Sequence, residues 1–145
     1  MIIKMLTVFG LGALELWAGV PAGFAFKMNP YLIFILTSGG AASGVFLVII
    51  AGEKIRSFLI KEKPEKEESS RFKKLVKIWE KYGVIGLGIL APWITGAPIG
   101  TAIGISLGAP AKKLFFWMLT GILICGAALT IITFMGIAGY KTLLR

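Results

Sequence analysis

Four long apolar segments constrain this chain more than any other feature of its sequence. They run from about Met5 to Phe26, from Tyr31 to Gly52, from Gly83 to Leu107 and from Leu114 to Gly139. Each has roughly the ~20 residues that an α-helix needs to cross the hydrocarbon core of a bilayer. Because the whole chain has 145 residues, one small domain is all that fits around these segments.

Charge is concentrated between the apolar segments instead of being spread along the chain. Only 16% of the residues are charged and 57% are hydrophobic, whereas about 25% of the residues in soluble domains are charged. Six of the seven acidic residues fall between Glu53 and Glu80, and ten of the 16 Lys and Arg residues lie between Lys54 and Lys81. Because a soluble protein needs charge over its whole surface, this distribution predicts an integral membrane protein.

Proline and glycine interrupt the first and third apolar segments. The second and fourth segments contain no proline, and in each a proline lies shortly before the segment begins. Pro21, Pro92 and Pro98 fall inside apolar stretches, where each proline costs a helix about 3 kcal/mol or more. Pieces such as 5–15 and 98–107 extend roughly 15 Å, about half of a ~30 Å hydrocarbon core. We therefore expect re-entrant hairpins that enter and leave by one face, with kinked spanning helices as the alternative.

Both halves of the chain repeat the order of broken segment, proline-marked turn and intact helix. One hairpin plus one crossing reverses sidedness, so the fold class predicted is all-α, with two inverted repeats of a re-entrant hairpin and a transmembrane helix. The predicted ranges are repeat one at 1–59 (hairpin 5–28, transmembrane helix 30–53), a basic loop and helix at 60–82, and repeat two at 83–145 (hairpin 83–108, transmembrane helix 112–139). Inverted repeats with interrupted helices are typical of transporters whose site lies at the midplane.

A basic segment separates the two halves. From Arg71 to Tyr82 the apolar residues follow helical spacing, and the opposite face takes Lys73, Lys74, Lys77, Glu80 and Lys81. A basic amphipathic helix with Trp and Tyr suits a membrane surface. The positive-inside rule accounts for the net charge of +9, so we expect a multi-pass protein of the cytoplasmic membrane, this loop in the cytoplasm, and no nucleic-acid partner. With re-entrant hairpins both termini lie outside; with four crossings both lie inside.

Glu15 is the strongest single candidate for a functional residue. It is the only acidic residue outside the central block, and it lies near the middle of the first apolar segment. A charge at mid-membrane costs at least about 2.5–3.5 kcal/mol, and such groups often relay protons or contact substrate. A neutral Glu that caps a broken helix is the structural alternative. Trp93 and Thr95, in the matching break of the second half, are its candidate partners.

Two sets of residues are therefore singled out. The candidate substrate or proton site takes residues from the two breaks: Glu15, Trp17, Pro21, Pro92, Trp93, Thr95 and Pro98. The candidate packing residues are glycines spaced by four: Gly40, Gly44, Gly96, Gly100, Gly104 and Gly108. Small residues at this spacing let helices approach closely. The functional alternative is that these glycines line a permeation path. For Trp17 and Trp93, packing or an interfacial position is the structural alternative to contact with a ligand.

Residues that the chain lacks exclude several chemistries. It contains no His and no Asp, so it has no Ser-His-Asp triad and no His/Cys spacing typical of a metal site. The single cysteine, Cys125, lies in an apolar stretch and cannot form an intrachain disulfide. We therefore expect no enzyme activity, no metal and no cofactor.

Two stretches resemble a known family. Glu15-Leu-Trp-Ala-Gly-Val-Pro-Ala-Gly resembles the Glu-Leu-Arg-Gly-Ala-Ile-Pro-type motif of the small multidrug export protein family. Lys81-Tyr-Gly-Val-Ile-Gly-Leu-Gly, with the stretch from Pro92 to Gly104, resembles that family's second half. Trp17 stands where the family usually has Arg, which argues against a Glu–Arg pair here.

That family is distantly similar to the DedA/VTT (SNARE-associated) membrane proteins. The resemblance implies two facing re-entrant hairpins and the movement of lipids, including polyprenyl phosphates, or proton-dependent transport. We therefore expect a lipid translocase or proton-linked exporter, with membrane lipids and protons as its partners. Because a single copy is small for enclosing a pathway, we also expect a homodimer. A structural or assembly protein that packs with partner helices is the alternative, and an intramembrane enzyme is the third hypothesis.

Overall fold

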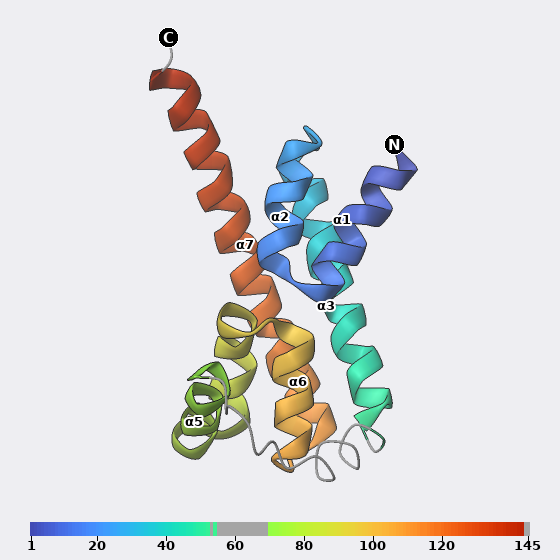
Figure 1. Ribbon diagram of the computed structural model, residues 1–145, viewed down its shortest axis with the longest axis vertical. Coiled ribbons are helices and arrows are strands. Elements are labelled where there is room, and N and C mark those ends of the chain that lie inside the picture. Colours follow the sequence, from blue (N-terminus) through green and yellow to red (C-terminus); the bar gives the residue numbers. More distant parts are fainter. Residues whose placement is uncertain (53, 55–69, 144–145) are drawn as a thin grey trace.

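The computed structural model describes residues 1–52, 54 and 70–143. This part of the chain is all-helical, as the sequence predicts. Its helices are α1 (Ile2–Leu14), α2 (Leu16–Ala25), α3 (Pro30–Ile50), α5 (Ser70–Ile94), α6 (Ala97–Ser106) and α7 (Ala111–Leu143) (Figure 1). The predicted loop over 60–69 lies outside the described residues.

Two helices, α3 and α7, are long and apolar enough to cross a membrane. Their apolar stretches are Pro30–Ile50, with 21 residues, and Ala111–Tyr140, with 30 residues, and both have a mean hydropathy of 2.2. A helix of about 20 residues extends ~30 Å, which is the thickness of the hydrocarbon core. These are the two segments predicted to be unbroken, so the structure has two candidate membrane-spanning helices where the sequence predicts them.

The start of α3 shows why the chain begins a helix there. Asn29 is the N-cap, and its side chain accepts a hydrogen bond of 3.0 Å from the Tyr31 amide. Pro30 occupies the first turn, where its missing N–H would have had no partner within the helix. The cap therefore fixes the turn that joins α2 to α3.

The remaining helices form two hairpins, α1–α2 and α5–α6. The 13 residues of α1 and the 10 residues of α2 and of α6 extend about 20 Å and 15 Å, which is less than the ~30 Å core. Each hairpin has its tip near the middle of the molecule (Figure 1). The α1–α2 hairpin opens toward the upper end, where the N-terminus and the last part of α7 lie, and α5–α6 opens toward the lower end.

In both hairpins the helical backbone is interrupted at a residue that is not a proline. The chain leaves helical geometry at Glu15, which is extended, and at Gly96, whose φ is 87°. Pro21 and Pro92 lie inside α2 and α5, and Pro98 lies in the first turn of α6. A first-turn proline costs no hydrogen bond, so Gly96, with a conformation that other residues rarely adopt, marks the second break.

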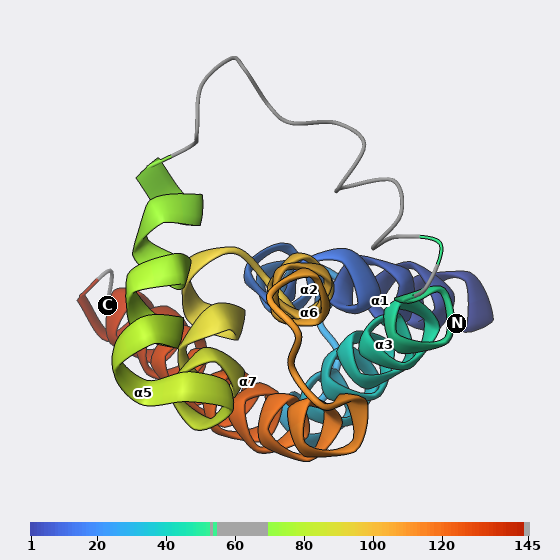
Figure 2. The same cartoon turned by 90° about the horizontal axis from the view of Figure 1, so that it is seen from below.

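The helix α5 changes direction at Gly83, where φ is 62° and ψ is −147°. Before Gly83 the helix lies across the lower end of the molecule; after it the helix runs alongside α7 (Figure 2). Leu75 is fully buried, and Ile78 and Trp79 pack against the core. The apolar face of the basic helix is therefore largely covered by the protein itself.

The core lies where the hairpin helices meet α3 and α7. Helix α1 packs on α3, α5 packs on α7, α2 contacts both long helices, and α6 also contacts both. Two glycines allow the closest approaches: a Cβ on Gly40 would collide with the backbone oxygen of Phe9, and one on Gly121 would collide with that of Gly88. Because these obstacles are backbone atoms, only glycine fits at either contact.

The C-terminal part of α7 extends beyond the other helices (Figure 1). Apolar side chains there are exposed, including Ile132 at 62%, Met135 at 66% and Leu143 at 87%. No part of the described chain covers them.

Candidate functional site

The tips of the two hairpins meet near the centre of the molecule. The rings of Trp17 and Trp93 lie edge to face, with centroids 6.5 Å apart and an interplanar angle of 76°. A Cβ placed on Gly96 would lie 3.5 Å from the backbone oxygen of Leu14. The structure thus brings the break at Glu15 next to the break at Gly96, although the two are far apart in the sequence.

Two helices begin at this meeting point, α2 at Leu16 and α6 at Ala97. Neither has a side-chain cap. The Glu15 carbonyl accepts from the Ala18 and Gly19 amides at 3.2 and 3.1 Å, and the Gly96 carbonyl accepts from the Gly100 amide at 3.1 Å. The first amides of each helix have no partner within their own helix and carry a partial positive charge, so two positive helix ends lie at the centre.

Glu15 lies at the tip of the first hairpin with its side chain exposed. It takes the N-cap position of α2, but its carboxylate caps no amide, so the capping role considered from the sequence is not seen. Among residues 1–52, 54 and 70–143 its side chain has no hydrogen bond and no ion pair. The carboxylate is therefore available to water, to a ligand or to another protein chain.

The residues proposed as partners of Glu15 have other contacts. The Thr95 hydroxyl donates to the carbonyls of Ala91 and Gly96 at 3.4 and 3.5 Å, distances at the weak end of hydrogen bonding. Trp93 contacts Trp17. Within the described residues, neither Trp93 nor Thr95 forms a hydrogen bond with Glu15.

The candidate glycines divide into two structural roles. Gly44 lies at a junction of three helices, because its Cβ would meet the Ala13 oxygen at 2.6 Å and the Pro98 ring at 3.1 Å. Gly100 and Gly104 face α5 and α7, where a Cβ would meet Ala91 and Leu87. Gly96 and Gly108 instead take positive φ values of 87° and 88° at the two ends of α6.

Sequence reasoning missed one contact between the long helices. The Ser38 hydroxyl is buried, 7% exposed for the residue, and has no hydrogen-bond partner within the described part of the chain. A Cβ on Gly126 would lie 2.9 Å from the Ser38 oxygen, so α3 and α7 are in close contact here. A hydroxyl directly before Gly39 and Gly40 in an apolar helix is the sequence signal that could have identified it.

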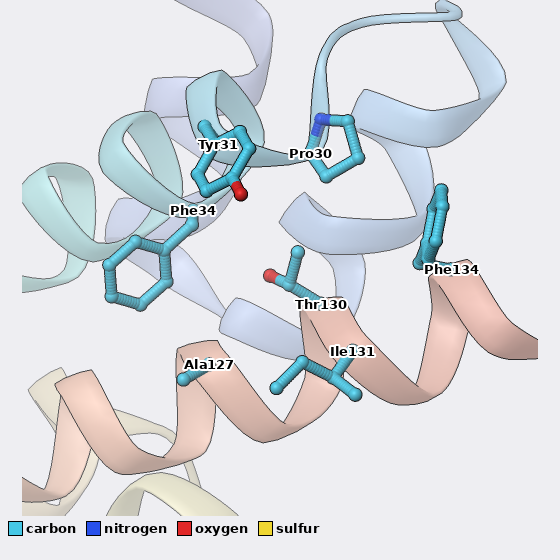
Figure 3. Close-up of a pocket in the computed structure, with 7 residues that line it drawn as sticks. All are labelled: Pro30, Tyr31, Phe34, Ala127, Thr130, Ile131 and Phe134. Atoms are coloured by element: carbon cyan, nitrogen blue, oxygen red, sulfur yellow. The ribbon is translucent and has the colours of Figure 1, made fainter.

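A pocket of about 440 Å³ lies between the start of α3 and the outer part of α7 (Figure 3). It is lined by Pro30, Tyr31, Phe34, Ala127, Thr130, Ile131 and Phe134. The Thr130 hydroxyl donates to the Gly126 carbonyl at 2.7 Å. The lining contains no carboxylate and no amine, so it suits an apolar group such as an acyl chain and shares no residue with the hairpin tips.

A family model described as "Putative small multi-drug export protein" matches residues 15–128. The match begins at the tip of the first hairpin and ends within α7, and it covers most of the chain. No curated protein and no solved structure matches the chain.

Proposed function

The chain belongs to the small multi-drug export protein family, and from this premise we propose that it is a transporter of the cytoplasmic membrane. The family match and the two apolar helices support a membrane protein with a role in export. Its cargo is either a lipid, such as a polyprenyl phosphate or a phospholipid, or a solute whose export is coupled to protons. The observation that carries the proposal is the meeting of two hairpin tips beside Glu15.

Both hairpins are proposed to be re-entrant, one from each side of the membrane. The short lengths of α1, α2 and α6 support this, because none of them can cross a ~30 Å core. In this proposal the chain would form two inverted repeats of the DedA/VTT type, with the basic loop in the cytoplasm and both termini outside. In such repeats, the site lies where the interrupted helices meet.

The uncapped starts of α2 and α6 are proposed to bind an anionic group such as a phosphate. Free amides and the helix dipole both favour negative charge at these positions. Glu15 would then receive or release the coupled proton, and Trp17 and Trp93 would form one wall of the site. Pro21, Pro92, Thr95 and Pro98 would shape the helices around it.

We propose that the working unit is a homodimer. Glu15 is exposed and without a partner in the described chain, and a carboxylate at mid-membrane needs water or a partner. A second copy would enclose the space in front of Glu15 and would also cover the projecting part of α7. Neither protomer needs a metal or a cofactor for this role, and we propose no enzyme activity.

A structural or assembly protein remains the second candidate. It was suggested by glycines that could receive a partner's helix. Gly40, Gly44, Gly100 and Gly104 instead contact helices of the same chain. Because these surfaces are occupied, they favour the transporter over the assembly protein.

Lipid movement in proteoliposomes tests the proposal. Wild type, Glu15→Gln and the control Glu80→Gln would be reconstituted with a fluorescent polyprenyl phosphate or phospholipid, and quenching of the outer leaflet would be followed. We expect quenching beyond half for wild type and for Glu80→Gln, and a return to the protein-free rate for Glu15→Gln. Rates for wild type equal to those of protein-free vesicles would reject lipid transport for the probes used. Activity retained by Glu15→Gln would reject the role of Glu15.

A further inference from the structure

The part of α5 before Gly83 has one apolar face and one basic face. Leu75, Ile78 and Trp79 point into the protein, where they are buried or packed against the core. Lys73, Lys74 and Lys77 are exposed. At 100° per residue these three lysines fall within about 100° of one another around the helix, so they form one basic face, which is turned away from the core.

This basic face is hollowed. Ser70, Lys73, Lys74 and Lys77 line a pocket of about 340 Å³. Glu80, the acidic residue in the described part of this helix, lies about one turn after Lys77 on the same side of the helix. Lys81 follows on the same side, where its amine lies 5.2 Å from the centre of the Tyr82 ring. Three of the four residues that line the pocket are therefore lysines, and the fourth is a serine.

The position of the pocket places it near lipid headgroups. The helix lies across the lower end of the molecule, the same end at which α3 ends and α7 begins (Figures 1 and 2). Lys112 and Lys113, at the start of α7, are also exposed. Lysines at the ends of spanning helices mark the boundary between hydrocarbon and headgroups, so the lysine pocket opens at the depth where lipid phosphates lie.

We propose that the face formed by Lys73, Lys74 and Lys77 binds the phosphate-bearing headgroups of anionic lipids in the leaflet at this end. Lysine amines bind phosphate as point charges, and clusters of basic residues beside spanning helices attract anionic lipids. Because the apolar face of the helix is packed inside the protein, charge carries the binding, without insertion of the helix into the acyl region. This site is separate from the hairpin tips and does not depend on transport.

Lipid retention by the full-length protein tests the site. The protein would be extracted from bilayers of equal phosphatidylglycerol and phosphatidylcholine, and bound lipid would be measured by native mass spectrometry. We expect wild type to retain phosphatidylglycerol over phosphatidylcholine. The double variant Lys74→Gln/Lys77→Gln should lose about 25-fold in apparent affinity, because each lysine near the surface contributes roughly fivefold.

The matched control is Lys112→Gln/Lys113→Gln, which removes the same charge at the same end of the molecule. It should lower phosphatidylglycerol retention less than Lys74→Gln/Lys77→Gln does, because it leaves the three lysines of the pocket in place. Phosphatidylglycerol retention by wild type should also fall as the salt concentration is raised. This measurement uses wild type alone and does not depend on whether a variant folds.

Three results would overturn the proposal. One is equal retention of the two lipids by wild type, and another is equal loss in both double variants. The third is phosphatidylglycerol binding that appears only after Glu62, Glu65, Glu67 and Glu68 are changed to Gln, which would mean that this acidic stretch of the chain occupies the face instead.

Discussion

Single atoms decide how closely the helices of this protein pack. A Cβ on Gly40 would collide with the Phe9 carbonyl oxygen of α1, whereas a Cβ on the adjacent Gly39 would lie 3.7 Å from the Phe9 ring. A backbone oxygen cannot rotate away as a side chain can, so the two glycines differ in their tolerance of a methyl group.

Gly40→Ala is therefore expected to lower the free energy of unfolding by about 1–3 kcal/mol, the usual cost of overpacking. Gly39→Ala should change it by less than about 1 kcal/mol. Thermal unfolding in one detergent measures both. Equal unfolding temperatures for the two variants would contradict the close approach of α1 to α3.

For the Ser38 hydroxyl we expect the opposite effect, because its removal should not lower stability. It is buried beside Gly126 without a hydrogen-bond partner in the described chain. Removing a polar group that lacks a partner releases its desolvation cost, so Ser38→Ala should leave stability unchanged or raise it by up to about 1 kcal/mol.

Thr37→Val provides the comparison, because the Thr37 hydroxyl donates to the Ile33 carbonyl at 2.8 Å. This variant should lose about 0.5–1.5 kcal/mol. Chemical denaturation in the same detergent gives both values. A loss above 1 kcal/mol for Ser38→Ala would show that this hydroxyl has a partner.

At the scale of elements, the two hairpins are coupled through an aromatic pair. Trp17 belongs to α2 and Trp93 to α5, and their rings meet edge to face. Such pairs contribute about 0.5–1.5 kcal/mol beyond the area that they bury. A double-mutant cycle of Trp17→Ala and Trp93→Ala should give a coupling energy in this range.

The control cycle combines Trp17→Ala with Trp79→Ala, a residue of the basic helix on the other side of the Gly83 kink. Substitutions at separate sites add within about 0.3–0.5 kcal/mol, so this cycle should close near zero. If the first cycle also closes near zero, the hairpin tips do not support one another.

The kink at Gly83 within α5 is a second feature at the scale of elements. Its φ of 62° and ψ of −147° fall near a region that is essentially restricted to glycine and costs other residues about 1–3 kcal/mol. Gly83→Ala should lower the free energy of unfolding by that amount, as measured by thermal unfolding. Gly10→Ala should not, because a Cβ on Gly10 would have no atom within 4 Å. An unchanged unfolding temperature for Gly83→Ala would mean that the basic helix can continue straight.

At the scale of the molecule, the membrane sides of the termini depend on whether the two hairpins are re-entrant. The N-terminus and the end of α7 lie at the upper end, and α3 ends at the lower end (Figure 1). With re-entrant hairpins, the N-terminus and the basic helix lie on opposite sides of the membrane; with four crossings they share one side.

Labelling of single cysteines distinguishes these topologies. In a Cys125→Ala background, Ile2→Cys and Thr142→Cys should react with an impermeant thiol reagent from outside intact cells. Ser70→Cys should react only after the cells are opened. Labelling of Ile2→Cys and Ser70→Cys from the same side would exclude the re-entrant arrangement.

The sequence by itself determined the helical class, the two unbroken apolar helices and the family. These depend on local properties, since hydropathy, helix length and short motifs are set by neighbouring residues. The kinds of residue at the breaks could also be identified, because proline, glycine and an isolated carboxylate are unusual in apolar helices.

Only the tertiary structure decided how those residues are used. Trp17 meets Trp93, Gly100 and Gly104 pack while Gly96 and Gly108 end a helix, and the apolar face of the basic helix turns inward. Each of these outcomes depends on atoms from a distant part of the chain, and the spacing of residues along one helix contains no information about which atoms will lie opposite.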